Sequence, residues 1–168
     1  MELIFRQTTA ADMDRIMEII GQAQAQMRAL GSKQWQNGYP ALANIASDAE
    51  HGYGYVLCDR HRIIAYAAVV FDGEAAYASI DGAWLSDRPY VVVHRLAVAN
   101  ERKQQGIAAQ FLCHVEGLCA ARGVGSFRID TNFDNHYMLH LLEHQGFAYC
   151  GEIRYSDDFR QAFEKLLP

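Results

Sequence analysis

The stretch of this chain best equipped for chemistry is Arg102-Lys103-Gln104-Gln105-Gly106-Ile107-Ala108. It follows a strongly β-prone segment and opens a segment with helical periodicity, which predicts a loop at a helix start. The first turn of a helix carries N–H groups without intrahelical acceptors and the positive end of the dipole, so it favours an anion. Gly106 lets the backbone approach a ligand, and Arg102 and Lys103 add positive charge. The pattern indicates a phosphate or pyrophosphate site, and it fits equally an ordinary helix start with a charged, exposed loop.

Motifs and net charge remove several other kinds of site. The phosphate-binding pattern G-x-x-x-x-G-K-[ST] does not occur, and Gly52-Tyr53-Gly54 meets Leu57 where the dinucleotide-binding fingerprint needs its third glycine. The 15 Lys and Arg residues against 20 Asp and Glu give a net charge of -5, whereas a general nucleic-acid binder is basic. We therefore expect no nucleic-acid partner and no anionic membrane partner.

The cysteines and the first residues of the chain indicate in which cellular compartment the protein is expected. Cys58, Cys113, Cys119 and Cys150 are far apart and form no C-x-x-C pair, which argues against a zinc ribbon or a thioredoxin-type site. We interpret them as reduced and mostly buried. The chain begins with a strand-like segment, and its apolar runs fall short of the ~18 residues of a membrane helix. The expectation is a cytoplasmic protein, with no signal peptide, whose 168 residues form one domain, 1–168.

Hydrophobic periodicity predicts the element order β-α-α-β-β-β-β-α-β-α-β with a further strand at the end. Residues 76–85 are ambiguous between a strand and an irregular connection. The expected helices cover residues 10–30, 41–50, 107 to Gly123 and 134–145. The expected strands lie near residues 3–5, 53–58, 63–71, 90–98, 126–131, 147–155 and 161–166. Together they make a mixed α/β sheet with strand–helix–strand units in the second half of the chain.

The run from Lys103 to Ala108 resembles the [QR]-x-x-G-x-[GA] motif of the GNAT superfamily of N-acetyltransferases. The preceding residues 94–98 are similar to the fourth strand of that fold. Residues 130–135 and 141–147 are similar to its fifth strand, fourth helix and glycine-phenylalanine turn. The resemblance spans about residues 3–166 and implies a GNAT-like fold, with a mixed, mostly antiparallel, twisted sheet of six to seven strands flanked by four helices.

The resemblance implies acetyl-coenzyme A as co-substrate and no metal. Carried over by position, backbone groups of Leu96, Ala97 and Val98 pair with the pantetheine arm, and the loop amides hold the pyrophosphate. The implied cofactor-binding residues are Leu96, Ala97, Val98, Lys103, Gln104, Gln105, Gly106, Ile107, Ala108 and Asn135. Lys103 stands where Arg or Gln is usual, and we expect it to be tolerated because the backbone does most of the holding. Its charge is an added attraction for the anion.

The implied reaction is transfer of the acetyl group directly to a primary amine of a small molecule or peptide. This needs a base, and His94 in the β-prone segment is the candidate, since strand alternation places it on one face with Leu96 and Val98. A core histidine is the alternative. Many members of the family have, at the position of Leu142, a tyrosine that acts as general acid on the leaving thiolate. Tyr137 and His140 are on the same expected helix and are candidates to replace it, but helical spacing points them in other directions from position 142.

Two other functions stay open. Leu142 is compatible with a non-catalytic domain that binds or senses acyl-coenzyme A. His140-Leu141-Leu142-Glu143-His144 spells H-x-x-E-H, an inverted zinc-hydrolase motif in which His140 and His144 would be ligands, but too little chain follows to bring a third ligand on another helix.

The acceptor amine cannot be read from the sequence. Trp35, Tyr39 and Trp84 are candidates for an acceptor pocket, with ordinary packing the better expectation for Trp84. The acidic net charge favours a cationic acceptor only weakly. Dimers are common in the family, which makes a homodimer one expectation.

Overall fold

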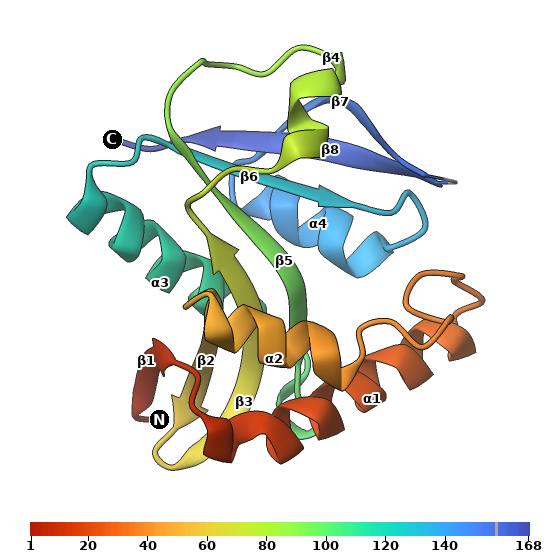
Figure 1. Ribbon diagram of the computed structural model, residues 1–168, viewed down its shortest axis with the longest axis vertical. Helices are drawn as coiled ribbons and strands as arrows, with labels where there is room; N and C mark the ends of the chain where they lie inside the picture. Colours follow the sequence, from red (N-terminus) through yellow and green to blue (C-terminus); the bar gives the residue numbers. More distant parts are fainter. Residues whose placement is uncertain (157) are drawn as a thin grey trace. The chain divides into compact units, whose positions relative to one another are not determined.

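The computed structural model describes residues 1–156 and 158–168, which fold into two compact units (Figure 1). In these residues the chain forms four α-helices and eight strands. None of the described helices is long and apolar enough to cross a membrane. Unit 1 comprises residues 1–69 and 94–114, and unit 2 comprises residues 70–93 and 115–168.

Unit 1 is built on antiparallel strands. Strand β1 (Leu3–Gln7) pairs with β2 (Gly54–Asp59), and β2 pairs with β3 (Arg62–Val70), which is followed in the sheet by β5 (Tyr90–Val98). The burial of β3 from its second residue onward agrees with a strand covered on both faces. The helices of this unit are α1 (Met13–Ala29), α2 (Leu42–Glu50) and the first part of α3 (Ile107–Arg122).

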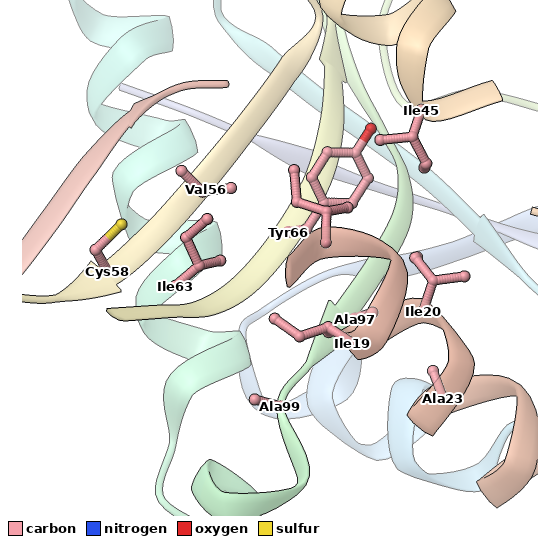
Figure 2. Packing of buried hydrophobic residues seen from close by; sticks show 11 residues of the cluster. Ile19, Ile20, Ala23, Ile45, Val56, Cys58, Ile63, Tyr66, Ala97 and Ala99 are labelled. Atoms are coloured by element: carbon pink, nitrogen blue, oxygen red, sulfur yellow. The ribbon is translucent and has the colours of Figure 1, made fainter. Parts of the chain in front are cut away.

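The core of unit 1 shows why those residues form those elements. Ile16, Ile19, Ile20 and Ala23 recur at helical spacing on α1 and bury one face of the helix. They belong to one cluster with residues of the strands and with Ile45 of α2, most of which Figure 2 labels. The remaining strand members of this cluster are Val56, Cys58, Ile63, Tyr66 and Ala97, with Ala99 just beyond β5.

Phe5 marks the other packing layer of unit 1. Its ring stacks on Tyr55 at 5.0 Å between centroids and meets Phe111 of α3 edge-on at 5.1 Å. In β2, Tyr55 and Val56 therefore serve different layers, as the period of two in a strand requires. This layer holds the first turns of α3 against the sheet of unit 1.

Unit 2 contains a parallel pair of strands. The first residues of β5 pair in parallel with β6 (Ser126–Thr131), and the order continues through β8 (Asp158–Leu166), β7 (Ala148–Tyr155) and β4 (Asp81–Gly82) by antiparallel pairing. A short 3-10 helix, η2 (Ala75–Ser79), precedes β4, and α4 (His136–His144) follows β6.

The predicted order of helices and strands is confirmed, as is the mixed, mostly antiparallel sheet. The predicted count of six to seven strands is low by at least one. The ambiguous residues 76–85 contribute η2 and then the two-residue β4, which pairs with β7. The last segment forms a full strand because β8 is paired on both edges, with β6 and with β7.

All four cysteines are free thiols. Cys58, Cys119 and Cys150 are buried, and Cys113 is exposed. Burial raises the pKa of Cys119 to about 11, so that thiol stays protonated at neutral pH.

Candidate active site

Strand β5 runs from the parallel pair into the predicted cofactor segment. Its ladder with β6 covers Tyr90 to Val92, opposite Ser126 to Arg128, so the backbone groups farther along β5 take no part in that ladder. Ala97 is 4% exposed and belongs to the core of unit 1 (Figure 2), while Leu96 and Val98 are half-buried. The three residues predicted to pair with the pantetheine arm thus lie in one continuous strand that the core holds through Ala97.

Arg95 interrupts the extended conformation of this strand. Its φ is +59°, in the left-handed region that non-glycine residues rarely adopt. Regular alternation therefore does not carry from His94 to Leu96, so the expected shared face of these two side chains lacks its physical basis. His94 is half-buried in β5 and makes contacts there.

A buried ion pair fixes the guanidinium of Arg95. Its Nε donates to Oδ2 of Asp48 at 3.0 Å, its Nη2 donates to Oδ1 of the same carboxylate, and its Nη1 donates to the hydroxyl of Tyr39 at 2.9 Å. The hydroxyl of Tyr66 donates to Asp48 as well. Asp48 is 4% exposed and Tyr66 is fully buried. The side chain of Arg95 is thereby held at the point where β5 bends.

The charges of this network support one another. Burial alone would lower the pKa of Arg95, but the hydrogen bonds and charge of Asp48, together with Tyr39, raise it above its ordinary value. Burial and then the charge of Asp48 raise the pKa of Tyr66 well above the ordinary value of a tyrosine. Arg95 therefore stays charged and Tyr66 stays protonated as a donor. Sequence reasoning missed this network, although a lone Arg inside an apolar strand was a signal for it.

The loop after β5 has the backbone geometry of an anion cradle. A 3-10 turn, η3 (Asn100–Arg102), leads into Gln104 and Gly106, whose φ values are +61° and +74°. Helix α3 then begins, and its first bond runs from N of Gln110 to O of Gly106 at 3.1 Å. The amides before Gln110 have no acceptor within the helix. Apart from the two residues next to Gly106 in the chain, no described atom lies within 4 Å of the place a Cβ would take there, so the backbone is open at this point.

These features fit a pyrophosphate, because the free amides of a helix start supply donors and a positive potential. The predicted loop residues are brought together in this cradle by the backbone. Ile107 is buried and anchors the helix, Ala108 is half-buried, and Gln104 to Gly106 are exposed.

The basic side chains of the loop are already engaged. Arg102 donates to Asp59, and the ammonium of Lys103 donates to Oε1 of Gln26 on α1. The sequence had suggested that both charges attract an anion, whereas here Arg102 is paired with a carboxylate. Burial lowers the pKa of Lys103. An anion in this loop would therefore be held mainly by backbone groups.

Helix α1 also fixes the turn that precedes the cradle. Oε1 of Gln22 accepts the backbone N–H of Asn100 at 2.8 Å. Glu101 accepts hydrogen bonds from Arg15 and from Arg62, the latter at 2.9 Å. Side chains of α1 and of β3 therefore both hold the turn before the cradle, since Arg62 opens β3.

The predicted residues on α4 lie in unit 2. Asn135 is the N-cap of α4, and its Oδ1 accepts the N–H of Met138 at 3.2 Å. Leu142 is fully buried, and this position therefore belongs to the core of the fold. Tyr137 is 60% exposed and His140 is exposed as well.

The two histidines of the H-x-x-E-H motif are neighbours on α4. The ring centroids of His140 and His144 are 4.0 Å apart, and Nδ1 of His144 lies 2.9 Å from the carbonyl oxygen of His140. Across the described residues, His, Cys, Asp and Glu side chains form no group of three or more that could hold a metal ion. The pair lacks the third ligand that a zinc site needs.

The three candidate pocket aromatics have distinct surroundings. Trp35 packs against the core of unit 1. Tyr39 is 40% exposed and is linked to the guanidinium of Arg95. Trp84 packs as expected: its ring lies 4.3 Å from the guanidinium of Arg128, and its Nε1 donates to the carbonyl of Tyr77 at 2.9 Å.

Comparison with known proteins decides the family. The model of the acetyltransferase (GNAT) family matches residues 18–147, which is more than half of the chain. The chain belongs to the GNAT acetyltransferase family. Its family makes this protein an acyltransferase, and the GNAT fold expected from the motif residues is confirmed. A comparison with curated protein sequences gives no match.

Solved structures extend the likeness over the whole chain. A GNAT family acetyltransferase from Streptococcus agalactiae is 34% identical, with a TM-score of 0.90 over 99% of this chain and 96% of that one. A putative acetyltransferase from Staphylococcus aureus is 27% identical, with a TM-score of 0.75 over 98% and 99% of the two chains. The PaiA N-acetyltransferase from Thermoplasma acidophilum, solved in complex with coenzyme A, shares the fold at 12% identity, with a TM-score of 0.73 over 99% of each chain.

Proposed function

We propose that this protein transfers an acetyl group from acetyl-coenzyme A directly to a primary amine of a small molecule or peptide. The observation that carries the proposal is the cradle of Gln104 to Ala108, which follows β5 and opens α3 with two left-handed residues. When bound, acetyl-coenzyme A supplies an acetyl group activated as a thioester.

The chain's own residues would hold the co-substrate mainly through the backbone. Amides from Gln104 to Ala108 would bind the pyrophosphate, and the groups of Leu96 to Val98 would bind the pantetheine arm as an added strand does. Lys103 would contribute its backbone, since its ammonium is bonded to Gln26. The side-chain oxygen of Asn135 caps α4, so its nitrogen would be the group that faces the cofactor.

His94 would act as the base. The nitrogen of the acceptor forms a bond to the acetyl carbon, the bond from that carbon to sulfur breaks, and the proton leaving nitrogen passes to the imidazole of His94, directly or through a water. The sulfur leaves as a thiolate, which is stable enough to leave without an acid. Buried Leu142 supplies no proton, so the reaction in this chain does not depend on an acid at that position.

The test is a panel of amines assayed for release of free coenzyme A thiol, with acetyl-coenzyme A binding measured by calorimetry on the same protein. We expect binding together with turnover of at least one amine, whose acetylated product is identified by mass. Binding without turnover of any amine would instead support the domain that binds or senses acyl-coenzyme A.

His94→Ala tests the base at saturating amine across pH. A general base contributes about 10²–10⁴-fold to the rate, so kcat should fall by that factor while acetyl-coenzyme A binding is kept. His61→Ala, an exposed histidine in the turn between β2 and β3, is the matched control. A His94→Ala enzyme as fast as the wild type at every pH would remove His94 from the mechanism.

A further inference from the structure

The left-handed conformation of Arg95 is unusual because this residue lies inside a strand. The other described residues that are not glycine and have a positive φ all lie in turns or loops: Trp35, Arg60, Gln104 and Ser156. A left-handed conformation is unfavourable for a residue with a Cβ, and it persists only where the surrounding structure holds it. Backbone strain of this kind gathers at functional sites, so the groups that hold Arg95 are candidates for a functional role.

Two segments of unit 1 hold the side chain of Arg95. Asp48 of α2 accepts hydrogen bonds from Nε and Nη2, and Tyr39, in the loop before α2, accepts one from Nη1 at 2.9 Å. Tyr39 is itself fixed, because Nε2 of Gln24 on α1 donates to its carbonyl oxygen at 3.0 Å. Asp48 is fixed by the hydroxyl of buried Tyr66. The guanidinium therefore cannot turn away without breaking a buried ion pair.

The part of β5 that follows Arg95 is anchored separately. Ala97 belongs to the core of unit 1, and the N–H of buried Ala99 donates to the carbonyl oxygen of Ile64 in β3 at 2.9 Å. The strand is thus held by the core beyond the bend and by the side chain of Arg95 at the bend. The bend between His94 and Leu96 has a defined position because both supports are rigid.

The order of the proposed cofactor-binding groups directs the reactive end of the cofactor to this bend. In coenzyme A, the pantetheine arm connects the pyrophosphate to the sulfur. With the pyrophosphate in the cradle of Gln104 to Ala108, and the arm along the strand from Val98 to Leu96, the arm runs toward Arg95. The sulfur would then lie at the bend, next to His94, the proposed base.

We propose that Asp48 and Tyr39 are positioning residues, which act through the guanidinium of Arg95 to fix the part of β5 that meets the sulfur end of acetyl-coenzyme A. This inference rests on the proposed acetyl transfer. Neither side chain touches the reacting atoms; together they set where the backbone of β5 lies relative to the thioester and to His94. A displacement of about 1 Å at a reacting centre lowers a rate about 100-fold, whereas the pyrophosphate in the cradle is held by other residues.

The first experiment measures binding without turnover. Calorimetry titrates acetyl-coenzyme A, and separately 3′-phospho-ADP, which is the part of the coenzyme that ends at the pyrophosphate. Arg95→Gly carries no guanidinium, but its glycine adopts a left-handed φ freely. This variant should bind acetyl-coenzyme A about three- to tenfold more weakly than the wild type, the worth of one hydrogen bond to the arm, and 3′-phospho-ADP equally well.

The second experiment measures turnover of an amine that the wild type acetylates. In Arg95→Gly and in Asp48→Asn, kcat should fall about 10- to 100-fold because the reacting groups are no longer aligned. The KM for acetyl-coenzyme A should rise by no more than about tenfold. Tyr39→Phe removes one acceptor of the guanidinium and leaves the ion pair, so its kcat should fall only about three- to tenfold.

Asp12→Asn is the matched control. Asp12 is a buried carboxylate of unit 1 that accepts two hydrogen bonds from the guanidinium of Arg6, at 2.8 and 3.0 Å, and neither residue belongs to β5. This variant should unfold at a lower urea concentration than the wild type, as Asp48→Asn should. It should keep the wild-type kcat and the wild-type affinity for both ligands when it is assayed without urea.

The outcomes separate the positioning role from the proposed acetyl transfer. Weaker binding of acetyl-coenzyme A alone, in a protein that acetylates no amine, would keep the positioning role and reject the acetyl transfer. Wild-type kcat and affinities in Arg95→Gly would reject the positioning role, as would an equal loss of kcat in Asp12→Asn or an equal loss of affinity for 3′-phospho-ADP. If Arg95→Gly and Asp48→Asn do not fold, unchanged kcat and acetyl-coenzyme A affinity in Tyr39→Phe reject the role.

Discussion

Asp48 in unit 1 and Asp130 in unit 2 are both held by a tyrosine hydroxyl, yet they differ in one group. Asp48 also receives two hydrogen bonds from the guanidinium of Arg95 and is 4% exposed. Asp130 receives a second tyrosine instead of a cation and is half-buried. Removing Asp48 would leave the guanidinium of Arg95 without its counter-ion, whereas removing the charge of Asp130 would affect only uncharged hydroxyl donors.

The largest expected effect distinguishes the two carboxylates by stability. Asp48→Asn leaves the guanidinium of Arg95 without its counter-ion, and breaking a buried pair costs about 3–5 kcal/mol. Asp130→Asn leaves no cation behind, so it should cost less than about 1 kcal/mol. Urea unfolding of both variants measures the difference. Equal losses of unfolding free energy would mean that the two carboxylates have the same role.

The second prediction concerns backbone groups instead of side chains. In the cradle, the backbone at Gly106 has no neighbouring side chain over it. Gly106→Ala places a Cβ where the pyrophosphate would approach and should raise the KM for acetyl-coenzyme A about tenfold or more, by weakening a hydrogen bond to a charged group. Steady-state kinetics measures this value.

Gly123→Ala is the matched control for that variant. Gly123 has φ +69° against +74° at Gly106, and a Cβ on it likewise meets no described atom within 4 Å apart from its chain neighbours. Both variants should lose the same stability, about 1–2 kcal/mol for a left-handed non-glycine residue. An unchanged KM in Gly106→Ala, or an equal rise in Gly123→Ala, would contradict the cradle.

The third prediction concerns Glu101, an exposed residue whose carboxylate pairs with the two cations Arg15 and Arg62. The backbone amide of Glu101 itself has the largest effect on the pKa of Glu101, and burial opposes it. The hydrogen bonds from Arg62 and Arg15 add to the effect of the amide, so the pKa falls to about 2. The contribution of Glu101 to stability is therefore complete above its ordinary pKa of 4.5 and is lost as the pH falls toward 2. Glu101→Gln should cost less than about 1 kcal/mol at pH 7 because exposed pairs are weak.

Unfolding in urea at pH 7, 4.5 and 3 measures this effect, with Glu143→Gln on the exposed face of α4 as the control. The difference between Glu101→Gln and the wild type should shrink between pH 4.5 and pH 3. A difference that grows at low pH would have the wrong sign.

The smallest effect is expected at Lys103. Its side chain is next to the cradle, but its ammonium donates a hydrogen bond to Gln26. Lys103→Met should change the KM for acetyl-coenzyme A by less than about threefold, since the backbone amides still bind the anion. Kinetics at two salt concentrations measures it. A tenfold rise in KM that disappears at high salt would show that the ammonium turns to the cofactor.

Much of the fold could be predicted because its signals are local. The helical spacing of Ile16, Ile20 and Ala23, and the apolar run of β3, each describe one element and its buried face. The two-residue β4 could not be predicted, because so short a strand exists only by pairing with β7. The left-handed Arg95 was equally hidden, since its conformation is associated with a carboxylate 47 residues earlier in the chain.

The sequence by itself determined the local geometry of the segment from Gln104 to Ala108, since a strand, a polar loop with a glycine and a helix start are encoded by neighbouring residues. Only the tertiary structure decided which polar side chains have a partner inside the protein. Lys103 and Arg102 look free in the sequence and are engaged in the fold. Asp130 looks like an ordinary strand end, and the fold makes it the acceptor of two tyrosine hydroxyls because η2 and β7 bring Tyr77 and Tyr155 to it.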